Sequence, residues 1–241
     1  MLRGIGSVFS FLTILPTGSA NLETVARYMY LFPLAGLALG LLVGSAGFGL
    51  SLFLDPLIVG LLVVASIAVL TGIHHADGLS DFADGLMAKG TREKRLAAMK
   101  DLSTGSAGTV SIVLYLVGLV VVFSMAEGYD LFLIILLGEI MAKFSMVLLA
   151  CMSRPAWQGS SVPFVNIMKD RKRMLVSGMI ALVPIVMLGG AAGLLVFATG
   201  IIATMIIAAV SARSFGGITG DVLGAANELT RLASVMVFVS V

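Results

Sequence analysis

Six long apolar runs constrain this sequence more than any other feature. They cover residues 31–54, 57–73, 107–126, 131–152, 174–189 and 192–210, and an α-helix of about 17–25 residues crosses a bilayer. Because backbone polar groups must be paired internally in lipid, we expect these runs to be helical. The sequence therefore predicts an all-α, polytopic integral membrane protein that forms a single domain over residues 1–241.

The two ends of the chain differ from these runs. Residues 1–20 imitate a secretory signal, but polar residues and Pro16 interrupt their apolar stretch. We interpret this segment as an interfacial or re-entrant helix that stays in the mature protein. The tail at 232–241 is about half as long as a crossing, so we expect about six to seven transmembrane helices in total.

The positions of the basic residues predict how these helices are oriented. Of the fifteen Lys and Arg residues, all except Lys143 lie near the N-terminus or in the polar segments 74–106, 153–173 and 211–231. The short turns at 55–56, 127–130 and 189–190 contain none. By the positive-inside rule the long polar segments face the cytoplasm, which predicts a multi-pass protein of the cell (inner) membrane.

The longest polar interruption, residues 73–108, contains the strongest candidate site. Asp77, Asp81 and Asp84 recur at i, i+4 and i+7, so on a helix they lie within about 60° of one another. Like charges stacked in this way destabilise a helix, and a divalent cation would relieve their repulsion. Oxygen ligands favour Mg²⁺ or Mn²⁺, which also bind substrate phosphates. The alternative is a solvated helix whose acids pair with nearby Arg and Lys residues.

Further polar residues suit phosphate binding around this stripe of aspartates. Cationic side chains would neutralise phosphate oxygens, glycine-rich backbone would offer amide groups to an anion, and an aspartate from a second loop would complete the metal shell. Arginines at a membrane edge also anchor helices, and glycines also serve close helix packing, so both interpretations stay open. The candidate substrate-binding residues are Arg92, Arg95, Lys100, Ser103, Gly105, Arg154, Thr219 and Asp221.

Glu139 and Lys143 stand at i, i+4 inside an apolar run. We expect them to pair with each other and to face the helix bundle; a substrate contact is the alternative. Gly36, Gly40 and Gly44 form a stripe of small residues. Such a stripe suits close helix packing, either within one subunit or in a homo-oligomer.

Taken together, these motifs resemble a known enzyme family. The block His74-His-Ala-Asp-Gly-Leu-Ser-Asp-Phe-Ala-Asp-Gly85, the run from Arg92 to Asp101 and the loop Gly105-Ser-Ala-Gly108 are similar to the signature of adenosylcobinamide-GDP ribazoletransferases, the membrane-bound cobalamin synthases. The block Gly216-Gly-Ile-Thr-Gly-Asp221 and the segment 11–16 resemble further parts of that family. The resemblance extends to about residue 228.

The resemblance implies a Mg²⁺-dependent transferase of the last stage of cobalamin (vitamin B12) biosynthesis. Such enzymes transfer the adenosylcobinamide phosphate moiety from adenosylcobinamide-GDP to α-ribazole or its 5′-phosphate, releasing GMP. Here Asp77, Asp81 and Asp84 would hold the metal, and Asp101 or His74 would act as the general base for the attacking hydroxyl. We expect these substrates and the lipid bilayer as partners, no nucleic acid, and an active site at the cytoplasmic edge.

Two other functions compete with this interpretation. A CDP-alcohol phosphotransferase of phospholipid synthesis would share the Asp81-x2-Asp84-Gly pattern, but that family's motif continues with a glycine and two aspartates at positions 98, 102 and 106, where this chain has other residues. A cation transporter would need acidic residues inside its spans, where this chain has Glu139 beside Lys143.

Overall fold

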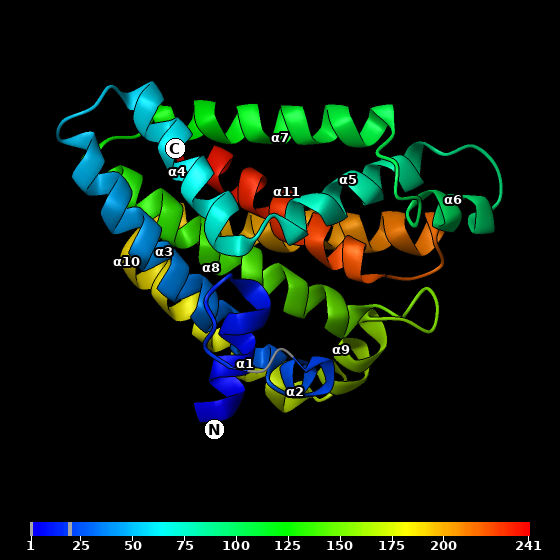
Figure 1. Cartoon of the computed structure of the whole chain (residues 1–241). Helices are drawn as coiled ribbons and strands as arrows, with labels where there is room; N and C mark the ends of the chain where they lie inside the picture. Colours follow the sequence, from blue (N-terminus) through cyan, green and yellow to red (C-terminus); the bar gives the residue numbers. More distant parts are fainter. Residues whose placement is uncertain (1, 19–20) are drawn as a thin grey trace.

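A computed structural model describes residues 2–18 and 21–241. Within these residues the chain forms helices and no β-strand, with one isolated bridge between Pro155 and Ile218. Figure 1 shows the helices arranged around the long helix α8, against which α3, α10 and α11 pack. The helices are α1 (Leu2–Leu12), α2 (Leu22–Arg27), the short 3-10 helix η1 (Met29–Leu31), α3 (Phe32–Ser51), α4 (Pro56–Thr71), α5 (His74–Met87), α6 (Arg92–Ala98), α7 (Ser106–Ser124), α8 (Gly128–Met152), α9 (Ser161–Met168), α10 (Arg171–Ser214) and α11 (Gly220–Phe238).

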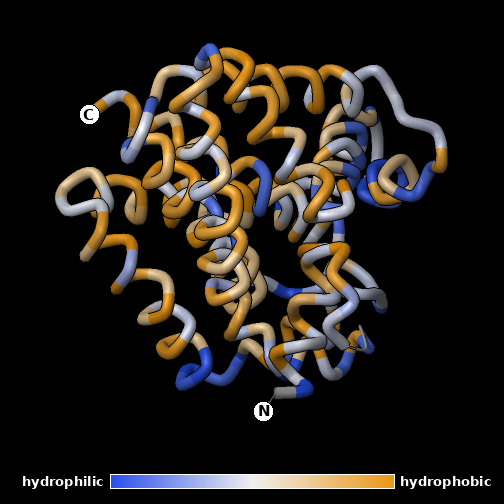
Figure 2. Tube along the Cα trace, turned by 60° about the vertical axis from the view of Figure 1, so that its left-hand side comes forward, coloured by the Kyte–Doolittle hydropathy of each residue, from blue (hydrophilic) through white to orange (hydrophobic). Residues whose placement is uncertain are grey.

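Within the described part of the chain, four helical stretches are long and apolar enough to cross a membrane. They are Met29–Ser51, α7, α8 and α10. Helices α4 and α5 meet the criterion only when taken together, and they are bent by 93° relative to each other. Figure 2 shows hydrophobic residues along most of the length of these helices. The prediction of an all-helical membrane protein is confirmed.

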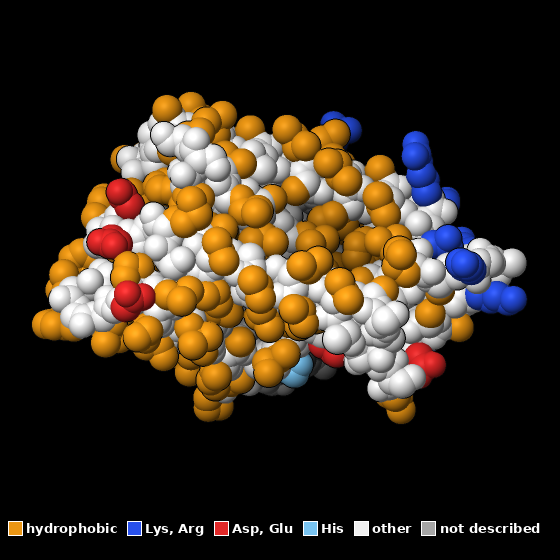
Figure 3. All heavy atoms as spheres, turned by 90° about the horizontal axis from the view of Figure 1, so that it is seen from above, with side chains coloured by type: hydrophobic (Ala, Val, Ile, Leu, Met, Phe, Trp, Pro, Cys, Tyr) orange, Lys and Arg blue, Asp and Glu red, His pale blue; other side chains and the backbone are white. Residues whose placement is uncertain are grey.

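Charged side chains gather at opposite ends of the molecule. Figure 3 shows Lys and Arg at one end, a group of acidic side chains at the other, and a broad hydrophobic belt between them. Asp55 and Glu127 are exposed in the turns that join α3 to α4 and α7 to α8, and Asp130 is exposed in the first turn of α8. This separation of charge matches the pattern from which the orientation was predicted.

α10 consists of two helices joined by a sharp break. Gly190 has φ 54° and ψ −129°, which is not helical and favours glycine. Just beyond it, a Cβ atom at Gly193 would overlap the carbonyl oxygen of Ile185, so the two halves pack closely against each other. The turn predicted at residues 189–190 is therefore confirmed.

The prediction for the C-terminal segment is wrong. We expected a polar loop over residues 211–231 and half a crossing after it, but Gly220–Phe238 form the continuous helix α11. This helix packs against α8, α5 and α10. Asn227, Glu228 and Arg231 are buried on it, because they form polar contacts inside the bundle.

The junction between α4 and α5 turns the chain sharply. The Asp55 side chain accepts a hydrogen bond from Leu57 N at 3.0 Å and caps α4, which begins with Pro56. Gly72 ends α4 with φ 65°, and Ile73 follows with φ 64°. A left-handed backbone is rare for a β-branched residue. It directs α5 away from α4 and places the predicted site at the start of a new helix.

The small-residue stripe of α3 serves packing within this chain. A Cβ atom at Gly36 or Gly40 would overlap the backbone of α8 at Glu139 or Leu136. These glycines therefore let α3 lie directly on α8.

Candidate active site

α5 carries the predicted aspartate stripe, and its last member is held by the start of α7. Both carboxylate oxygens of Asp84 accept backbone hydrogen bonds, from Gly105 N at 2.7 Å and from Gly108 N at 2.8 Å. A Cβ atom at either glycine would overlap the Asp84 carboxylate, so only glycine permits this approach. A carboxylate is also favoured at a helix N-terminus. Asp84 therefore fixes α7 to α5.

The other wall of the site is the first turn of α11, which crosses α5 closely. Gly78 of α5 lies against the backbone of Asp221, and Gly224 of α11 lies against the backbone of His75. The Thr219 hydroxyl accepts from Val222 N at 3.2 Å and lies 3.1 Å from the Asp221 carboxylate. Thr219 thus caps the N-terminus of α11, and the first turn of this helix brings Asp221 to the aspartate stripe.

Burial and the like charges of neighbouring carboxylates both act on Asp81. Partial burial and the neighbouring charges of Asp77, Asp221 and Asp84 raise the pKa of Asp81 from its ordinary 3.8 to about 6. The aspartates therefore form an acidic site with unbalanced negative charge, which a cation would stabilise.

The carboxylates of this site suit Mg²⁺ better than a metal ion whose ligands all come from the protein. Among the residues that the structure describes, no three His, Cys, Asp or Glu side chains converge closely enough to hold a metal ion. Mg²⁺ is commonly bound by one or two carboxylates, with water and substrate phosphate as its other ligands. One or two of Asp77, Asp81 and Asp221 would fit that role, whereas Asp84 already binds two amides.

The three arginines of the prediction brace the loops around the acidic site. Arg92 donates to Ala156 O at 2.6 Å, Arg95 to Leu86 O at 2.5 Å and Arg154 to Gly216 O at 2.9 Å. The loops after α8 and α10 are also joined by backbone hydrogen bonds at the bridge between Pro155 and Ile218. Each guanidinium has five N–H donors, so these contacts leave donors for phosphate oxygens.

Lys100 and Ser103 lie on the exposed stretch between α6 and α7. The Lys100 ammonium group lies 4.0 Å from the ring centre of Trp157, and its charge acts on Asp221. The Ser103 hydroxyl and amide both donate to Asp101, at 2.6 and 3.0 Å. These hydrogen bonds lower the pKa of Asp101, which makes its carboxylate a weaker base. His74 is exposed at the start of α5.

Sequence reasoning missed most of a buried polar network beneath the site. Glu139 and Lys143 lie 3.8 Å apart as predicted, but each has a closer partner on α11. Arg231 Nε lies 2.6 Å from Glu139, and Lys143 donates to Asn227 at 2.7 Å. Arg231 also contacts Glu228 and Tyr115. The signal was the polar trio Asn227, Glu228 and Arg231, which we had placed in a loop.

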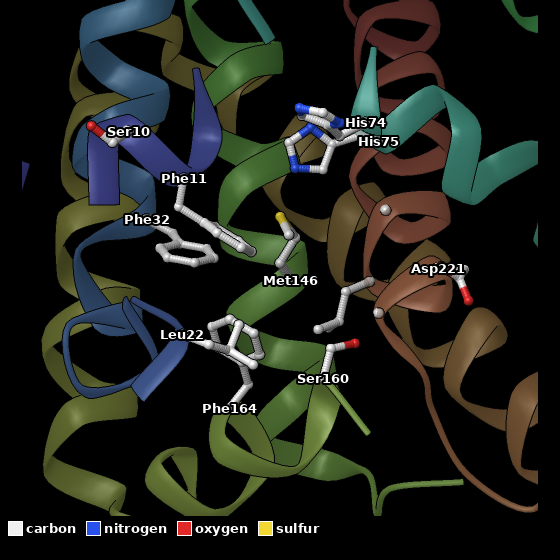
Figure 4. Close-up of a pocket in the computed structure, with 13 residues that line it drawn as sticks. Ser10, Phe11, Leu22, Phe32, His74, His75, Met146, Ser160, Phe164 and Asp221 are labelled. Carbon is white, nitrogen blue, oxygen red and sulfur yellow. The ribbon is translucent and has the colours of Figure 1, made fainter. Parts of the chain in front are cut away.

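A pocket opens next to the first turn of α11, between α5 and the N-terminal helices. Its volume is about 430 Å³, within the range of about 300–1,000 Å³ usual for small-molecule sites. Figure 4 shows three phenylalanine rings on one side of it and the two histidines on the other, with Asp221 at its edge. Sequence reasoning did not foresee this pocket, because its walls come from segments far apart in the chain. Its lining residues are Ser10, Phe11, Leu22, Phe32, His74, His75, Met146, Ser160, Phe164, Gly220, Asp221, Leu223 and Gly224.

These features define a helical membrane protein with an acidic, arginine-braced site and a pocket beside it. The sequence model of the family described as cobalamin-5-phosphate synthase matches residues 4–239. The chain belongs to this family.

Curated relatives extend over almost the whole chain. A protein of Methanocella arvoryzae is 34% identical over 97% of this chain and 94% of its own length, and one of Archaeoglobus fulgidus is 34% identical over 97% and 96%. One of Geotalea daltonii is 35% identical over 100% and 98%. All three are named adenosylcobinamide-GDP ribazoletransferase. No solved structure matches the chain significantly.

Proposed function

We propose that this protein is a cobalamin synthase that joins the adenosylcobinamide phosphate moiety of adenosylcobinamide-GDP to α-ribazole or its 5′-phosphate and releases GMP. The observation that carries the proposal is the match of the cobalamin-5-phosphate synthase family to residues 4–239. In the reaction, the acceptor hydroxyl oxygen bonds to the phosphorus nearer the corrinoid. The bond from that phosphorus to the GMP oxygen breaks, and the hydroxyl proton passes to a base.

The acidic site would bind the pyrophosphate of the donor through Mg²⁺. Asp77, Asp81 and Asp221 are the residues that we assign to the metal, with Asp84 in the supporting role that its bonds to Gly105 and Gly108 indicate. Mg²⁺ would supply charge stabilisation to the pyrophosphate oxygens and the departing GMP. The free N–H groups of Arg92, Arg95 and Arg154, together with Lys100, would neutralise the remaining phosphate oxygens.

His74 is the better of the two predicted general bases. Asp101 is exposed, and its hydrogen bonds from Ser103 lower its pKa, which opposes proton uptake. His74 lines the pocket beside Asp221, and its imidazole has a ring nitrogen that can accept a proton. We therefore assign the removal of the acceptor's proton to His74.

We also propose how the protein lies in its membrane. The two halves of α10, together with α3, α4, α7, α8 and α11, would give seven crossings, within the expected six to seven, and α5 would lie at the membrane edge. The basic end would face the cytoplasm by the positive-inside rule, so the active site would open there, and α1 would lie at the same interface. The α3 stripe packs on α8 within one chain, and a homo-oligomer stays a prediction.

The test is a transfer assay with the detergent-purified protein. Adenosylcobinamide-GDP, α-ribazole phosphate and Mg²⁺ should yield GMP and the corrinoid product, and chelation of the metal should abolish both. Asp81→Asn should lower the rate at least a hundredfold. Asp55→Asn is the matched control, because asparagine caps helices as well as aspartate does and Asp55 lies in a turn away from the site. Release of CMP from a CDP-linked donor, without GMP from the corrinoid donor, would refute the proposal in favour of the lipid-type phosphotransferase.

A further inference from the structure

The pocket beside α11 has one apolar end and one polar end. Phe11, Phe32 and Phe164 come from α1, α3 and α9 and form the apolar end. His74, Gly220 and Asp221 belong to the polar end, where the pocket meets the acidic site. A ligand that fills the pocket therefore needs an apolar part and, next to the aspartates, a polar part.

The apolar end is preformed and suits a flat ring. The ring centres of Phe11 and Phe164 lie 5.7 Å apart, and the ring centre of Phe32 lies 6.2 Å from each of them. At such distances aromatic rings support one another, so the three side chains hold each other in place. Figure 4 shows their rings turned towards the centre of the pocket.

A histidine lies on the opposite wall. His75 lines the pocket and is 6% exposed. Its Nδ1 atom is closed off from the cavity and has no hydrogen-bond partner among the described residues. The imidazole therefore meets a ligand in the pocket through its other ring nitrogen, Nε2.

We propose that this pocket binds the benzimidazole base of α-ribazole, with the base against the phenylalanine rings and its free ring nitrogen accepting a hydrogen bond from His75 Nε2. The proposal rests on the proposed function and identifies the acceptor subsite. A benzimidazole is flat and apolar, and in the nucleoside it keeps one acceptor nitrogen, which matches one free imidazole atom. The ribose would then extend past His74 towards Asp221.

Neither the corrin nor the guanine of the donor fits this pocket as well as the acceptor base does. The corrin macrocycle is much larger than a cavity of about 430 Å³. Guanine has several donors and acceptors on its edges, and most would lie unpaired against the phenylalanine and leucine side chains. The acceptor base is therefore the part of the two substrates that agrees with the pocket in size, shape and polarity.

The first test separates acceptor binding from donor binding by steady-state kinetics. Asparagine places its amide where the imidazole has Nδ1, and glutamine places it where the ring has Nε2. We expect His75→Asn to raise KM for α-ribazole about tenfold, the usual effect of losing one buried hydrogen bond, while KM for adenosylcobinamide-GDP stays within twofold. His75→Gln should recover most of the loss. Equal effects of both variants on the two KM values would overturn the proposal.

The second test fills the pocket and does not depend on turnover. Leu22→Trp adds a large ring at the start of α2, on the pocket wall. Leu52→Trp makes the same change at an exposed position away from the pocket. Equilibrium dialysis with benzimidazole, followed by its own fluorescence, should show binding to wild type and to Leu52→Trp, and at least tenfold weaker binding to Leu22→Trp.

The possible outcomes distinguish the two proposals. If the wild-type protein binds benzimidazole but catalyses no transfer, the proposed function fails. If it catalyses transfer, yet Leu22→Trp changes neither benzimidazole binding nor the acceptor KM, the pocket assignment alone fails. A phospholipid that co-purifies with wild type, is depleted by Leu22→Trp and is not displaced by benzimidazole would overturn the pocket assignment in favour of an acyl chain.

Discussion

Removing Arg231 should destabilise the whole bundle, because its guanidinium balances two buried carboxylates. Glu139 and Glu228 face Lys143 and Arg231 in a network of two negative and two positive groups, all at most 3% exposed. In Arg231→Met, Lys143 alone would remain to balance both acids, at 3.8 Å from Glu139. Breaking a buried pair in this way costs about 3–5 kcal/mol.

The change should be measurable as a shift in thermal unfolding of the purified protein in detergent. For a chain of this size, a loss of 1 kcal/mol lowers Tm by about 2–4 °C, so we expect Arg231→Met to lower Tm by about 6–20 °C. Adding Glu228→Gln to this variant should restore more than half of the loss, because it balances the charges again. Arg213→Met changes an exposed arginine and should alter stability by less than about 0.5 kcal/mol. A Tm within about 3 °C of wild type for Arg231→Met would refute the reasoning.

Two further predictions concern the acidic site. Gly108→Ala should reduce transfer at least tenfold, because the new Cβ would displace Asp84 and Ser80; Thr109→Ala, at an exposed neighbour, should keep the activity, and equal activities of the two variants would contradict this account. The raised pKa of Asp81 means that the folded protein binds this proton more tightly than the unfolded chain does. Without metal, the Asp81 contribution to stability should therefore fall as pH rises from about 4 to about 6 and then level off. The difference in Tm between wild type and Asp81→Asn, measured with chelator from pH 4 to 7.5, should show this change, and a pH-independent difference would exclude it.

Much of the fold could be predicted from the sequence because lipid imposes a simple rule on apolar segments. The runs at 31–54, 107–126 and 131–152 correspond to α3, α7 and α8, since uninterrupted apolar residues in a bilayer must be helical. The breaks at Asp55 and Gly190 could also be predicted from the sequence, because a proline follows Asp55 and a second glycine precedes Gly190.

The C-terminal helix was missed for a physical reason. Hydropathy treats each residue as if it met lipid alone, so Glu228 and Arg231 suggested a loop. In the protein Arg231 pairs with Glu228 and with Glu139. Arg231 and Glu139 are 92 residues apart in sequence, so a local sequence pattern cannot reveal their pairing.

The site shows the same limit. The spacing of Asp77, Asp81 and Asp84 predicted a shared helix face, and α5 is that helix. The spacing could not reveal that Asp84 binds two amides of α7. Nor could it reveal the aromatic pocket, since tertiary packing of α1, α3 and α9 creates it.

The polar character of α11 has a consequence for how the protein is made. A single charged side chain at the centre of a lone membrane helix raises its insertion free energy by about 2.5–3.5 kcal/mol. α11 brings Glu228 and Arg231, and α8 brings Glu139 and Lys143. In the proposed topology α11 enters the bilayer as a partner of α8, and until synthesis reaches residue 231 Glu139 and Lys143 lack the contacts that Arg231 and Asn227 provide.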